Sequence, residues 1–381
     1  MENKTLPIKS NEHRPQAAEH RLQEANDESP VQNKVMAREV LHPRTERQRR
    51  IRVSEPIIRL ASAEDVPLIR QLAVRCYGYT QERLLYDVDS FQQSLNTGEL
   101  VFFVITEPKG NIFYHLALKY HTPEVPEMGF AFMDLAYRCA GLSKQVGLTA
   151  LEYAKAHGAE GVFACSVTTH TASQKGMEEI GAFPCGLMMG IAATGMQSNV
   201  PDSTVQEKGS TVNQYIPINK AHRTIYLPAW HHGIATDIYG WMDLPRTVAQ
   251  GSGGTFSDSS PKLSVLRLGS DLNVAFILVN AIGRGVATAI DDARRCCQRL
   301  AMNAVYVFIP TGTPDAPSLV EECEHMGFFF AGLMPHIHDG EDRIILQWLA
   351  QDLDEDRIRM HGDKVRHLCH YVFQERKRVA P

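Results

Sequence analysis

The chain has 381 residues, of which 44% are hydrophobic, and its formal net charge at pH 7 is −5. A chain of this length is too long to form a single ordinary compact core, so we expect two domains and a tail. The small net charge argues against nucleic acid as a partner. No apolar leader is visible, and the longest apolar run, near 274–282, is shorter than the roughly 20 residues that span a bilayer. The sequence therefore predicts a cytoplasmic protein without a membrane partner.

The cysteines are scattered and form no C-x-x-C pair, and most lie in apolar runs. Buried, reduced thiols are the expectation for such positions. Cys296 and Cys297 are adjacent on an expected helix, so a structural disulfide between them is not expected.

Residues 1–54 are rich in Glu, Gln, Asn, Arg and His and contain almost no aromatic residues. Such a composition buries too little apolar surface to offset the entropy of ordering, so it predicts a disordered, basic and polar tail. The stretch 38–52 is strongly basic. It could contact RNA, lipid or an acidic partner, although a solvated run of charge is the plainer interpretation.

Residues 55–195 are predicted to form one folded domain of alternating strands and helices. Ser62–Asp65 is a capping box that opens a helix through Val74. The turn at 108–111 joins two strands into a hairpin. The expected strands are 57–60, 100–105, 112–120, 128–134, 161–167 and 182–191, and the expected helices are 62–74, 80–95, 141–156 and 172–180.

Residues 196–214 are rich in Ser, Thr, Gln and Gly and are predicted to be a linker to a second domain, 215–381. The pattern G-x-F-x-x-G-L-M occurs twice, at Gly181–Met188 and at Gly327–Met334. Each copy follows a long helix, a strand and a short helix in the expected order of elements. Two copies of one fold are therefore the economical interpretation.

The most informative segment is Asp134-Leu-Ala-Tyr-Arg138-Cys-Ala-Gly141-Leu-Ser143, between the fourth strand and the long helix. A loop in that place exposes backbone N–H groups that have no helical partner, next to the positive end of the helix dipole. Gly141 lets the backbone approach a ligand closely. The segment is thus predicted to bind phosphate.

At these residues the chain resembles the GNAT acyltransferases, whose pyrophosphate loop reads Arg/Gln-x-x-Gly-x-Gly/Ala and here reads Arg138-Cys-Ala-Gly141-Leu-Ser143. Tyr77-Gly78-Tyr79 and Ser173-Gln174-Lys175 also resemble a bacterial subgroup of tandem GNAT-like proteins. The resemblance implies an α/β (α+β) fold with a mixed sheet and two GNAT-like domains. It further implies that acetyl-CoA or another acyl-CoA is the co-substrate, and that the acceptor is an amine-bearing small molecule or protein.

The resemblance also implies which residues contact the cofactor. They are Met133, Asp134, Leu135, Arg138, Cys139, Ala140, Gly141, Leu142, Ser143 and Ser173. Three positions depart from the family pattern. Cys139 stands where the family often has Gly, and Ser143 stands at the final Gly/Ala of the loop. Met177 stands where other members have a Tyr that protonates the CoA thiolate.

Three residues are candidates for catalysis. Glu127 lies eleven residues before Arg138, the spacing at which some GNAT enzymes place a general base; otherwise it is a surface carboxylate. His170 follows the fifth strand and could relay a proton or bind substrate, or be an ordinary loop residue. Tyr79, Tyr86 or water could replace the acid missing at Met177, although a thiolate with a pKa of about 8.5 can also leave unaided.

The second copy carries Asn280-Ala-Ile-Gly283-Arg-Gly285 where its loop should be, and Gly269 lies eleven residues earlier. No carboxylate then matches Glu127, so this domain is expected to be degenerate, with a phosphate-binding loop or a plain turn.

Two histidine groups, His231-His232 and His336-Ile-His338, lack the Cys partners and the helical i, i+4 spacing of zinc sites. We expect surface loops there and no metal.

The sequence leaves three functional classes open. An acyl-CoA-dependent N-acyltransferase is favoured by Glu127, and a non-catalytic sensor of acyl-CoA or a metabolite is favoured by Met177 and Cys139. A structural or interaction protein that uses its tail is the third.

Overall fold

The structure is a computed structural model that describes residue 53 and residues 55–137, 141–192, 209–251, 256–268 and 272–380. The described residues all belong to one compact unit, 46–381. The tail expected over 1–54 therefore lies outside the described residues, apart from residue 53.

The first half of the described chain contains seven strands and four longer helices. They are β1 (Ile57–Leu60), α3 (Val66–Tyr77), α4 (Val88–Thr97), β2 (Leu100–Thr106), β3 (Ile112–Lys119), β4 (Glu127–Met133), α5 (Leu142–Ala156), β5 (Gly161–Val167), α6 (Ala172–Glu179), β6 (Phe183–Ala192) and β7 (Gly209–Pro217). The predicted capping box before α3 is present, since the Ser62 backbone N–H donates to Asp65 Oδ2 at 2.8 Å.

The second half continues with the elements β8 (Arg223–Tyr226), α7 (His232–Trp241), β9 (Arg246–Ala249), β10 (Lys262–Leu268), β11 (Val274–Ala281), α8 (Val286–Arg299), β12 (Ala304–Pro310), α9 (Ala316–His325), β13 (Phe329–His338), β14 (Glu341–Leu349) and α10 (Gly362–Val379). Strands β8 and β9 form a separate parallel pair.

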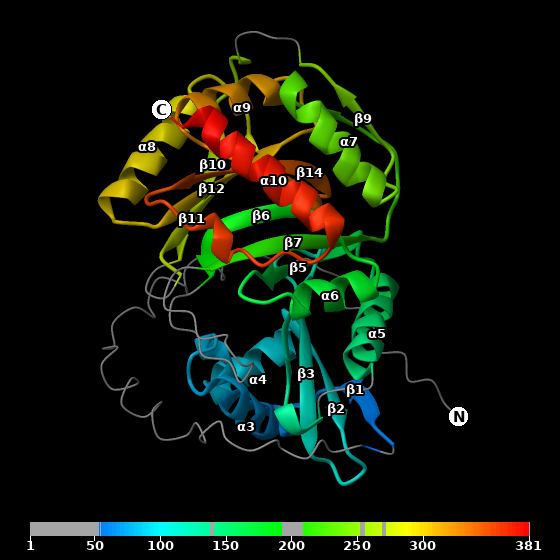
Figure 1. Ribbon diagram of the computed structural model, residues 1–381. Helices are drawn as coiled ribbons and strands as arrows, with labels where there is room; N and C mark the ends of the chain where they lie inside the picture. Colours follow the sequence, from blue (N-terminus) through cyan, green and yellow to red (C-terminus); the bar gives the residue numbers. More distant parts are fainter. Residues whose placement is uncertain are drawn as a thin grey trace. The chain divides into compact units, whose positions relative to one another are not determined.

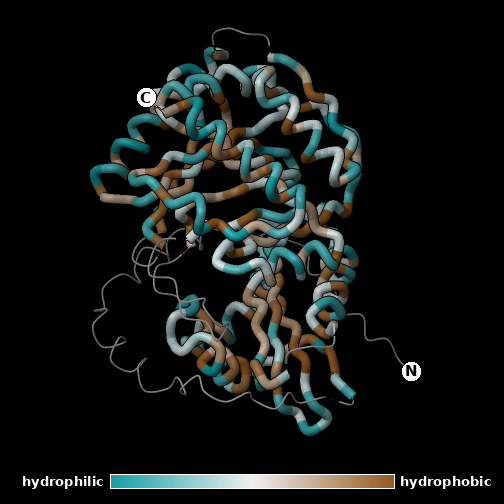
Figure 2. The backbone as a smooth tube through the Cα atoms, viewed as in Figure 1, coloured by the Kyte–Doolittle hydropathy of each residue, from teal (hydrophilic) through white to brown (hydrophobic). Residues whose placement is uncertain are grey.

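One mixed sheet of twelve strands runs through both halves, in the order β1-β2-β3-β4-β5-β7-β6-β13-β14-β12-β11-β10 (Figure 1). Helix α5 packs against one face of the first-half strands, and α3 and α4 pack against the other. In Figure 2 brown and tan predominate along the strands, whereas the helices alternate between teal, white and brown residues. The buried core clusters follow the sheet. The predicted α/β class with a mixed sheet is confirmed.

Strand β7 begins inside the segment expected to be a linker. It lies between β5 and β6 and is antiparallel to both. Its polar side chains are buried and find partners within the sheet; for example, Ser166 Oγ donates to Gln214 Oε1 at 2.7 Å. Residues 209–214 are therefore strand, and the linker prediction was wrong for them because buried polar pairs hide the apolar alternation of a strand.

The two halves repeat one arrangement of strands. The order β3-β4-β5-β7-β6 matches β10-β11-β12-β14-β13, and in both only the second and third strands are parallel. The order of strands and helices that predicted an internal repeat therefore occurs in both halves.

The halves meet where the repeated motif pairs with itself. Strand β6 is antiparallel to β13, with Gly186 opposite Gly332, the second glycine of each copy. A Cβ on Gly332 would lie 2.5 Å from the carbonyl oxygen of Cys185, so the strands can approach this closely only with glycine there. The repeated motif thus lies at the contact between the two halves.

Side chains extend this contact where the two strands diverge. The Gln347 side chain accepts from the Met189 backbone N–H at 2.8 Å and donates to Leu187 O at 3.0 Å. The Tyr306 hydroxyl donates to Met189 O at 2.6 Å. The second half therefore holds the end of β6 through buried hydrogen bonds.

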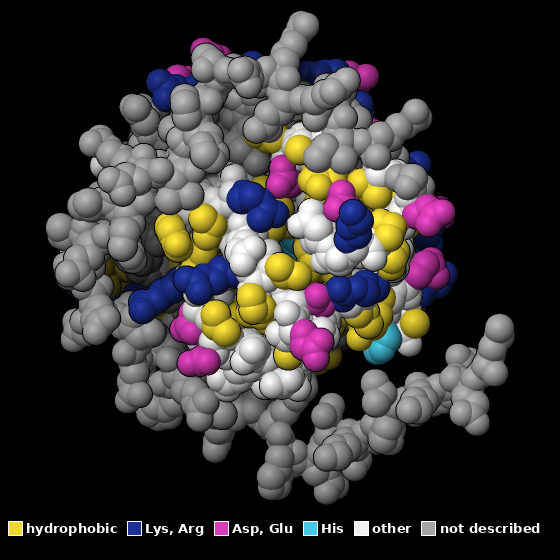
Figure 3. All heavy atoms as spheres, turned by 90° about the horizontal axis from the view of Figure 1, so that it is seen from below, with side chains coloured by type: hydrophobic (Ala, Val, Ile, Leu, Met, Phe, Trp, Pro, Cys, Tyr) yellow, Lys and Arg dark blue, Asp and Glu magenta, His cyan; other side chains and the backbone are white. Residues whose placement is uncertain are grey.

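The helices, the surface charges and the cysteines can each be compared with what the sequence predicts. No helix among the described residues is long and apolar enough to cross a membrane. On the face shown in Figure 3, basic, acidic and apolar side chains are interspersed across the described part. The described cysteines are free thiols, and five of the seven are buried.

Candidate functional site

Strand β4 contains a bulge in its pairing with β3. His115 pairs with Phe132 and Ala117 pairs with Gly129, so two residues of β4, 130 and 131, face the single Leu116 of β3. Phe130 has φ of 49°, which is uncommon for a residue with a side chain. Such bulges bend a strand and redirect it locally.

The bulge is followed by an opening between β4 and β5. The ladder between these parallel strands contains the single registered pair Glu127 and Phe163, at the start of β4. Ala131 is exposed although β4 is an inner strand of the sheet. Beyond the bulge β4 therefore has no registered partner on the β5 side, and backbone of this kind can pair with an extended ligand.

Helix α5 begins beside the end of β4. Its N-cap is Gly141, with φ of 70° and no capping hydrogen bond from a side chain. The first amides of a helix have no intrahelical acceptor and carry the positive end of the dipole. A Cβ on Gly141 would meet no atom within 4 Å, so described atoms do not crowd this position. The arrangement suits a phosphate.

The other predicted cofactor contacts fall into three groups. Arg138, Cys139 and Ala140 lie outside the described residues. Asp134 is anchored, since its Oδ2 lies 3.0 Å from Arg75 Nε and its Oδ1 accepts from the Ala136 backbone N–H at 3.1 Å.

The remaining contacts surround the start of α5 and α6. Met133 ends β4, Leu135 begins a short 3-10 turn, Leu142 is buried, and Ser143 is exposed. The hydroxyl of Ser173 is buried and has no hydrogen-bond partner among the described residues. Ser173 thus has a buried polar atom left over for a ligand.

Glu127 is held in an ion pair. Its Oε2 lies 3.0 Å from Lys119 Nζ and 3.0 Å from His121 Nε2. Burial acts to raise the pKa of Glu127, but Lys119 and His121 outweigh it and lower that pKa to about 2. Lys119 also lies 3.5 Å from Glu82 Oε1 and 4.5 Å from the centroid of the Phe130 ring.

Tyr79 belongs to the same end of the strands as Glu127. It lies three residues before Glu82, which reaches Lys119. Its side chain is 41% exposed, and its ring centroid is 5.2 Å from that of Tyr86. Tyr79 is therefore an exposed tyrosine that lies close in sequence to Glu82, the second carboxylate beside Lys119.

His170 is not brought together with Glu127. It follows the end of β5 at Val167, whereas Glu127 pairs with Phe163. Four residues of strand advance about 13 Å, so the two side chains belong to opposite ends of β5. His170 Nδ1 accepts from the Ala172 backbone N–H at 3.3 Å at the start of α6.

The second half has apolar residues at the positions of the ion pair. Counting along the paired strands places Phe276 where the first half has Glu127, because Phe276 pairs with Tyr306 and each partner is the third residue of its strand. By the same count Leu266 matches Lys119. Gly269, the expected counterpart of Glu127, lies outside the described residues, and the counterpart by register is Phe276.

The loop of the second half is covered in part by its own chain. Helix α8 has Gly285 as N-cap, and the Arg284 backbone N–H donates to Ser257 O at 3.0 Å and Ser259 O at 3.1 Å. A Cβ on Gly283 would lie 2.0 Å from Ser259 O, whereas a Cβ on Gly285 would meet no atom within 4 Å. Residues 257–259 therefore occupy the side of the loop at Gly283 and Arg284, where the first half has no such contact among the described residues.

His231 is buried, so the surface-loop prediction was wrong for it. Its Nε2 lies 2.9 Å from Glu324 Oε1, and its Nδ1 lies 2.7 Å from the Tyr371 hydroxyl. Ligand atoms of His231, Glu324 and Glu375 lie within 4.8 Å of one another. Arg378 Nη2 is 2.6 Å from both carboxylates, so a guanidinium already supplies the positive charge that a metal would bring.

His336 is likewise buried, again contrary to the prediction. Its Nδ1 is 2.8 Å from the Tyr215 hydroxyl and its Nε2 is 3.0 Å from Arg246 Nη2. Burial lowers the pKa of His336 to about 4. Arg246 pairs with Asp342 at 2.6 Å, so the ring belongs to a hydrogen-bonded network between the halves.

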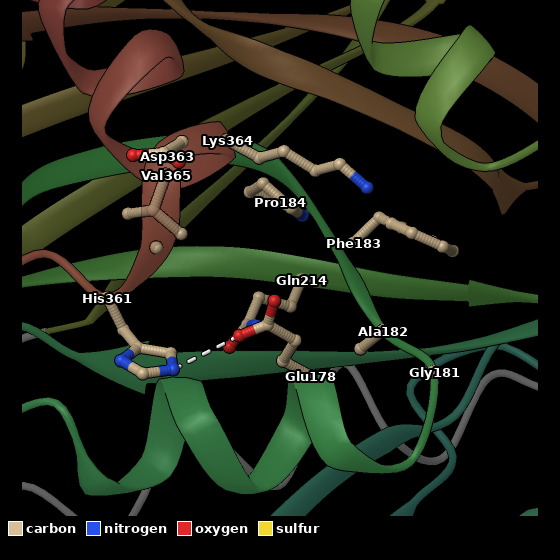
Figure 4. Close-up of a pocket in the computed structure, with 11 residues that line it drawn as sticks. Glu178, Gly181, Ala182, Phe183, Pro184, Gln214, His361, Asp363, Lys364 and Val365 are labelled. Atoms are coloured by element: carbon tan, nitrogen blue, oxygen red, sulfur yellow. Dashed lines mark ion pairs between the residues drawn. The ribbon is translucent and has the colours of Figure 1, made fainter.

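A cavity of about 240 Å³ lies at the junction of α6, β6, β7 and the start of α10 (Figure 4). His361 Nε2 faces Glu178 Oε2 at 3.1 Å across it, and Lys364 Nζ lies 4.5 Å from the Phe183 ring centroid. Its lining contains no residue of β4 or of the start of α5, so it is separate from the opening.

No family model matches the chain, and no curated protein matches its sequence. Solved structures that resemble part of it are GNAT N-acetyltransferases, the family that the sequence motifs predicted. A ribosomal-protein-S5-alanine acetyltransferase from Vibrio fischeri is 11% identical with a TM-score of 0.36, covering 44% of this chain and 95% of that one.

Two further structures show the same degree of likeness. An N-acetyltransferase from Staphylococcus aureus Mu50 is 16% identical with a TM-score of 0.35, covering 44% of this chain and 100% of that one. A spermidine N-acetyltransferase from Vibrio cholerae in complex with CoA and spermine is 14% identical with a TM-score of 0.33, covering 43% and 96%. What this chain binds must therefore be inferred from its own contacts.

Proposed function

We propose that the chain is an acyl-CoA-dependent N-acyltransferase that moves an acyl group, most simply acetyl, from CoA to an amine. One observation carries the proposal: the bulge at Phe130 separates β4 from β5 beside the N-terminus of α5 at Gly141. A backbone edge and a helix N-terminus placed in succession suit a ligand that has amide groups at one end and phosphates at the other.

The proposed cofactor lies along this opening. The pyrophosphate accepts hydrogen bonds from the first amides of α5, from Gly141 onward, and the resemblance of the loop adds Arg138, three residues earlier in the sequence, as a cation. The amides of the pantetheine arm pair with β4 between Ala131 and Met133. The thioester then points toward the start of β4, where Glu127 lies.

The proposed reaction forms one amide bond and breaks one thioester bond. The acceptor amine loses a proton, its nitrogen attacks the thioester carbonyl, and the CoA thiolate leaves and takes up a proton. Glu127 is the proposed base and Tyr79 the proposed proton donor to the thiolate, with His170 contacting the cofactor at the other end of β5.

Glu127 needs a change of partner to act as a base. Beside Lys119 its pKa is about 2, far too low to take a proton from an ammonium group with a pKa of about 10. Lys119 already lies within 3.5 Å of Glu82, so it can shift to that carboxylate when the acceptor binds. The burial of Glu127 would then raise its pKa toward a useful range.

A non-catalytic sensor of acyl-CoA is the second candidate. It is favoured by the ion pair between Glu127 and Lys119. It is also favoured by Met177, a buried residue at the position where the resemblance predicts a Tyr that acts as general acid. Such a protein would use the same opening to bind CoA and would not turn it over.

The two candidates differ in thiol release. Purified protein is mixed with acetyl-CoA and a panel of amines, including polyamines, amino acids and peptide N-termini, and free CoA thiol is followed. The enzyme proposal predicts amine-dependent release, whereas binding of acetyl-CoA without release supports the sensor. If calorimetry detects no binding of acetyl-CoA, both candidates fail.

A further inference from the structure

His115 lies in the centre of β3 and is fully buried. Its ring is stacked between two phenylalanines, with centroids 4.9 Å from Phe102 and 4.7 Å from Phe132. Its Nδ1 is 2.8 Å from the carbonyl oxygen of Phe130, the bulge residue with positive φ. The imidazole therefore touches the bulge that opens the sheet.

The protonation of this ring follows from its surroundings. Burial lowers the pKa of His115 to about 4, so the ring is neutral at pH 7 and has one N–H. A carbonyl oxygen can only accept, so the proton is on Nδ1 and points at Phe130. Among the described residues no group hydrogen-bonds to Nε2.

An unpaired buried nitrogen is unfavourable. A phenylalanine at position 115 would fill the same stack and leave no polar atom without a partner. The imidazole is distinguished from it by the hydrogen bond to Phe130. A buried backbone carbonyl needs such a donor, and at a bulge the ladder does not provide one.

In the second half, the carbonyl equivalent to that of Phe130 is bonded toward the other neighbouring strand. Val279 is the counterpart of Phe130 by strand register, and its carbonyl accepts from Arg343 Nη1 at 2.6 Å. The same nitrogen lies 3.3 Å from Phe308 O on β12. Arg343 thus bridges β11 to β12, and these strands stay paired over five residues each.

The carbonyl groups of Phe130 and Val279 are held toward different neighbouring strands in the two halves. In the first half His115 holds it toward β3, away from β5, and the β4–β5 ladder ends after one pair. In the second half Arg343 ties the equivalent carbonyl to β12, and the ladder continues. The counterpart of Arg343 in the first half is Thr211, whose side chain is too short to bridge in this way.

We propose that His115 is a positioning residue: its Nδ1–H bond to Phe130 holds the β4 bulge and thereby keeps the cofactor opening between β4 and β5. The ligand of that opening is the one in the proposed function, so this inference rests on it for its binding readout. His115 does not touch the reacting atoms.

The test compares two variants of the full chain, with acetyl-CoA as the probe. His115→Phe keeps the aromatic stack and loses the donor, and His115→Asn keeps an amide N–H near the Nδ1 position and loses much of the stack. We expect the Phe variant to bind acetyl-CoA about tenfold or more weakly with an unchanged or higher unfolding temperature. The Asn variant should bind within about threefold of wild type despite a lower unfolding temperature.

If His115 only stabilised the fold, the variant with the lower unfolding temperature would also bind acetyl-CoA more weakly. The proposal predicts the reverse: the more stable Phe variant binds more weakly than the less stable Asn variant. Wild-type affinity in the Phe variant would overturn the inference. A crystal structure of that variant gives a readout without ligand: we expect a negative φ at Phe130 and a longer β4–β5 ladder, and an unchanged bulge would also overturn it. If wild-type protein does not bind acetyl-CoA, the proposed function fails, and this structural readout still decides the role of His115.

Discussion

The charge state of Glu127 depends on two neighbours that sequence spacing alone could not reveal. Lys119 and His121 precede it by eight and six residues and reach it because β3 and β4 form a hairpin. The sequence singled out Glu127 by its distance from Arg138, but it gave no sign that the carboxylate is paired. His231 and His336 were misjudged for the same reason, because their partners Glu324 and Tyr215 are remote in sequence.

Replacing Glu127 tests its proposed role as the base. Glu127→Gln should leave acetyl-CoA affinity unchanged and lower kcat about 10²–10⁴-fold at neutral pH. The loss should shrink at high pH, where the amine is deprotonated without help. Thiol release against pH measures both effects, with calorimetry as the control for binding. A variant with wild-type kcat at pH 7 would remove Glu127 from the mechanism.

Replacing Lys119 tests the ion pair through stability. Because the pKa of Glu127 is lowered from 4.5 to about 2 in the fold, the pair stabilises the protein above about pH 4.5, and this contribution is lost as pH falls toward 2. In Lys119→Met the buried carboxylate keeps its desolvation penalty and retains only His121 as a partner. The free energy of unfolding should therefore differ between wild type and variant more at pH 7 than at pH 3.

Lys220→Met is the matched control, because Lys220 pairs with Asp243 at 2.8 Å on the surface. Urea unfolding of this variant should show a small effect at both pH values, as expected for an exposed pair. An equal cost of Lys119→Met at pH 7 and pH 3 would mean that the charge of Glu127 does not depend on Lys119.

Among the elements, strand β5 was predicted with the bounds that the structure has, and β7 was missed. Regular spacing of apolar residues over 161–167 indicates a strand. In β7 the polar residues Ser210, Thr211, Asn213 and Gln214 are buried, and their hydrogen-bond partners, such as Ser166 for Gln214, are not visible in the spacing. The bulge in β4 has no mark in sequence either, since Phe130 is not a residue that favours positive φ.

The close approach of strands β6 and β13 depends on glycine at positions 186 and 332. Gly332→Ala places a methyl group 2.5 Å from Cys185 O, so it should destabilise the protein by about 1–3 kcal/mol or more. Gly176→Ala is the control: it lies within α6 with no atom within 4 Å of a Cβ, and should stabilise by about 0.5–1 kcal/mol. Thermal unfolding measures both. A neutral Gly332→Ala would show that the strands can separate there at no cost.

At the scale of the molecule, two copies of one strand arrangement share a sheet but differ at the site. The first half has a bulged β4, the pair Glu127 and Lys119, and an uncrowded Gly141. The second has a continuous ladder, Phe276 and Leu266 at the matching positions, and residues 257–259 seated on its loop. The sequence predicted the repeat and a degenerate second copy, but the means by which the second loop is covered in part required the fold.

The central claim is that the chain binds one acyl-CoA, at the opening of its first half. Calorimetry of acetyl-CoA with wild type, Gly141→Asp and Gly285→Asp tests it most directly. Both glycines are N-caps with positive φ and open space at Cβ, so the two substitutions carry similar backbone strain. The account predicts one acetyl-CoA per wild-type chain, loss of binding in Gly141→Asp because a carboxylate then faces the pyrophosphate, and wild-type binding in Gly285→Asp. Two bound molecules per chain, or a loss confined to Gly285→Asp, would contradict it.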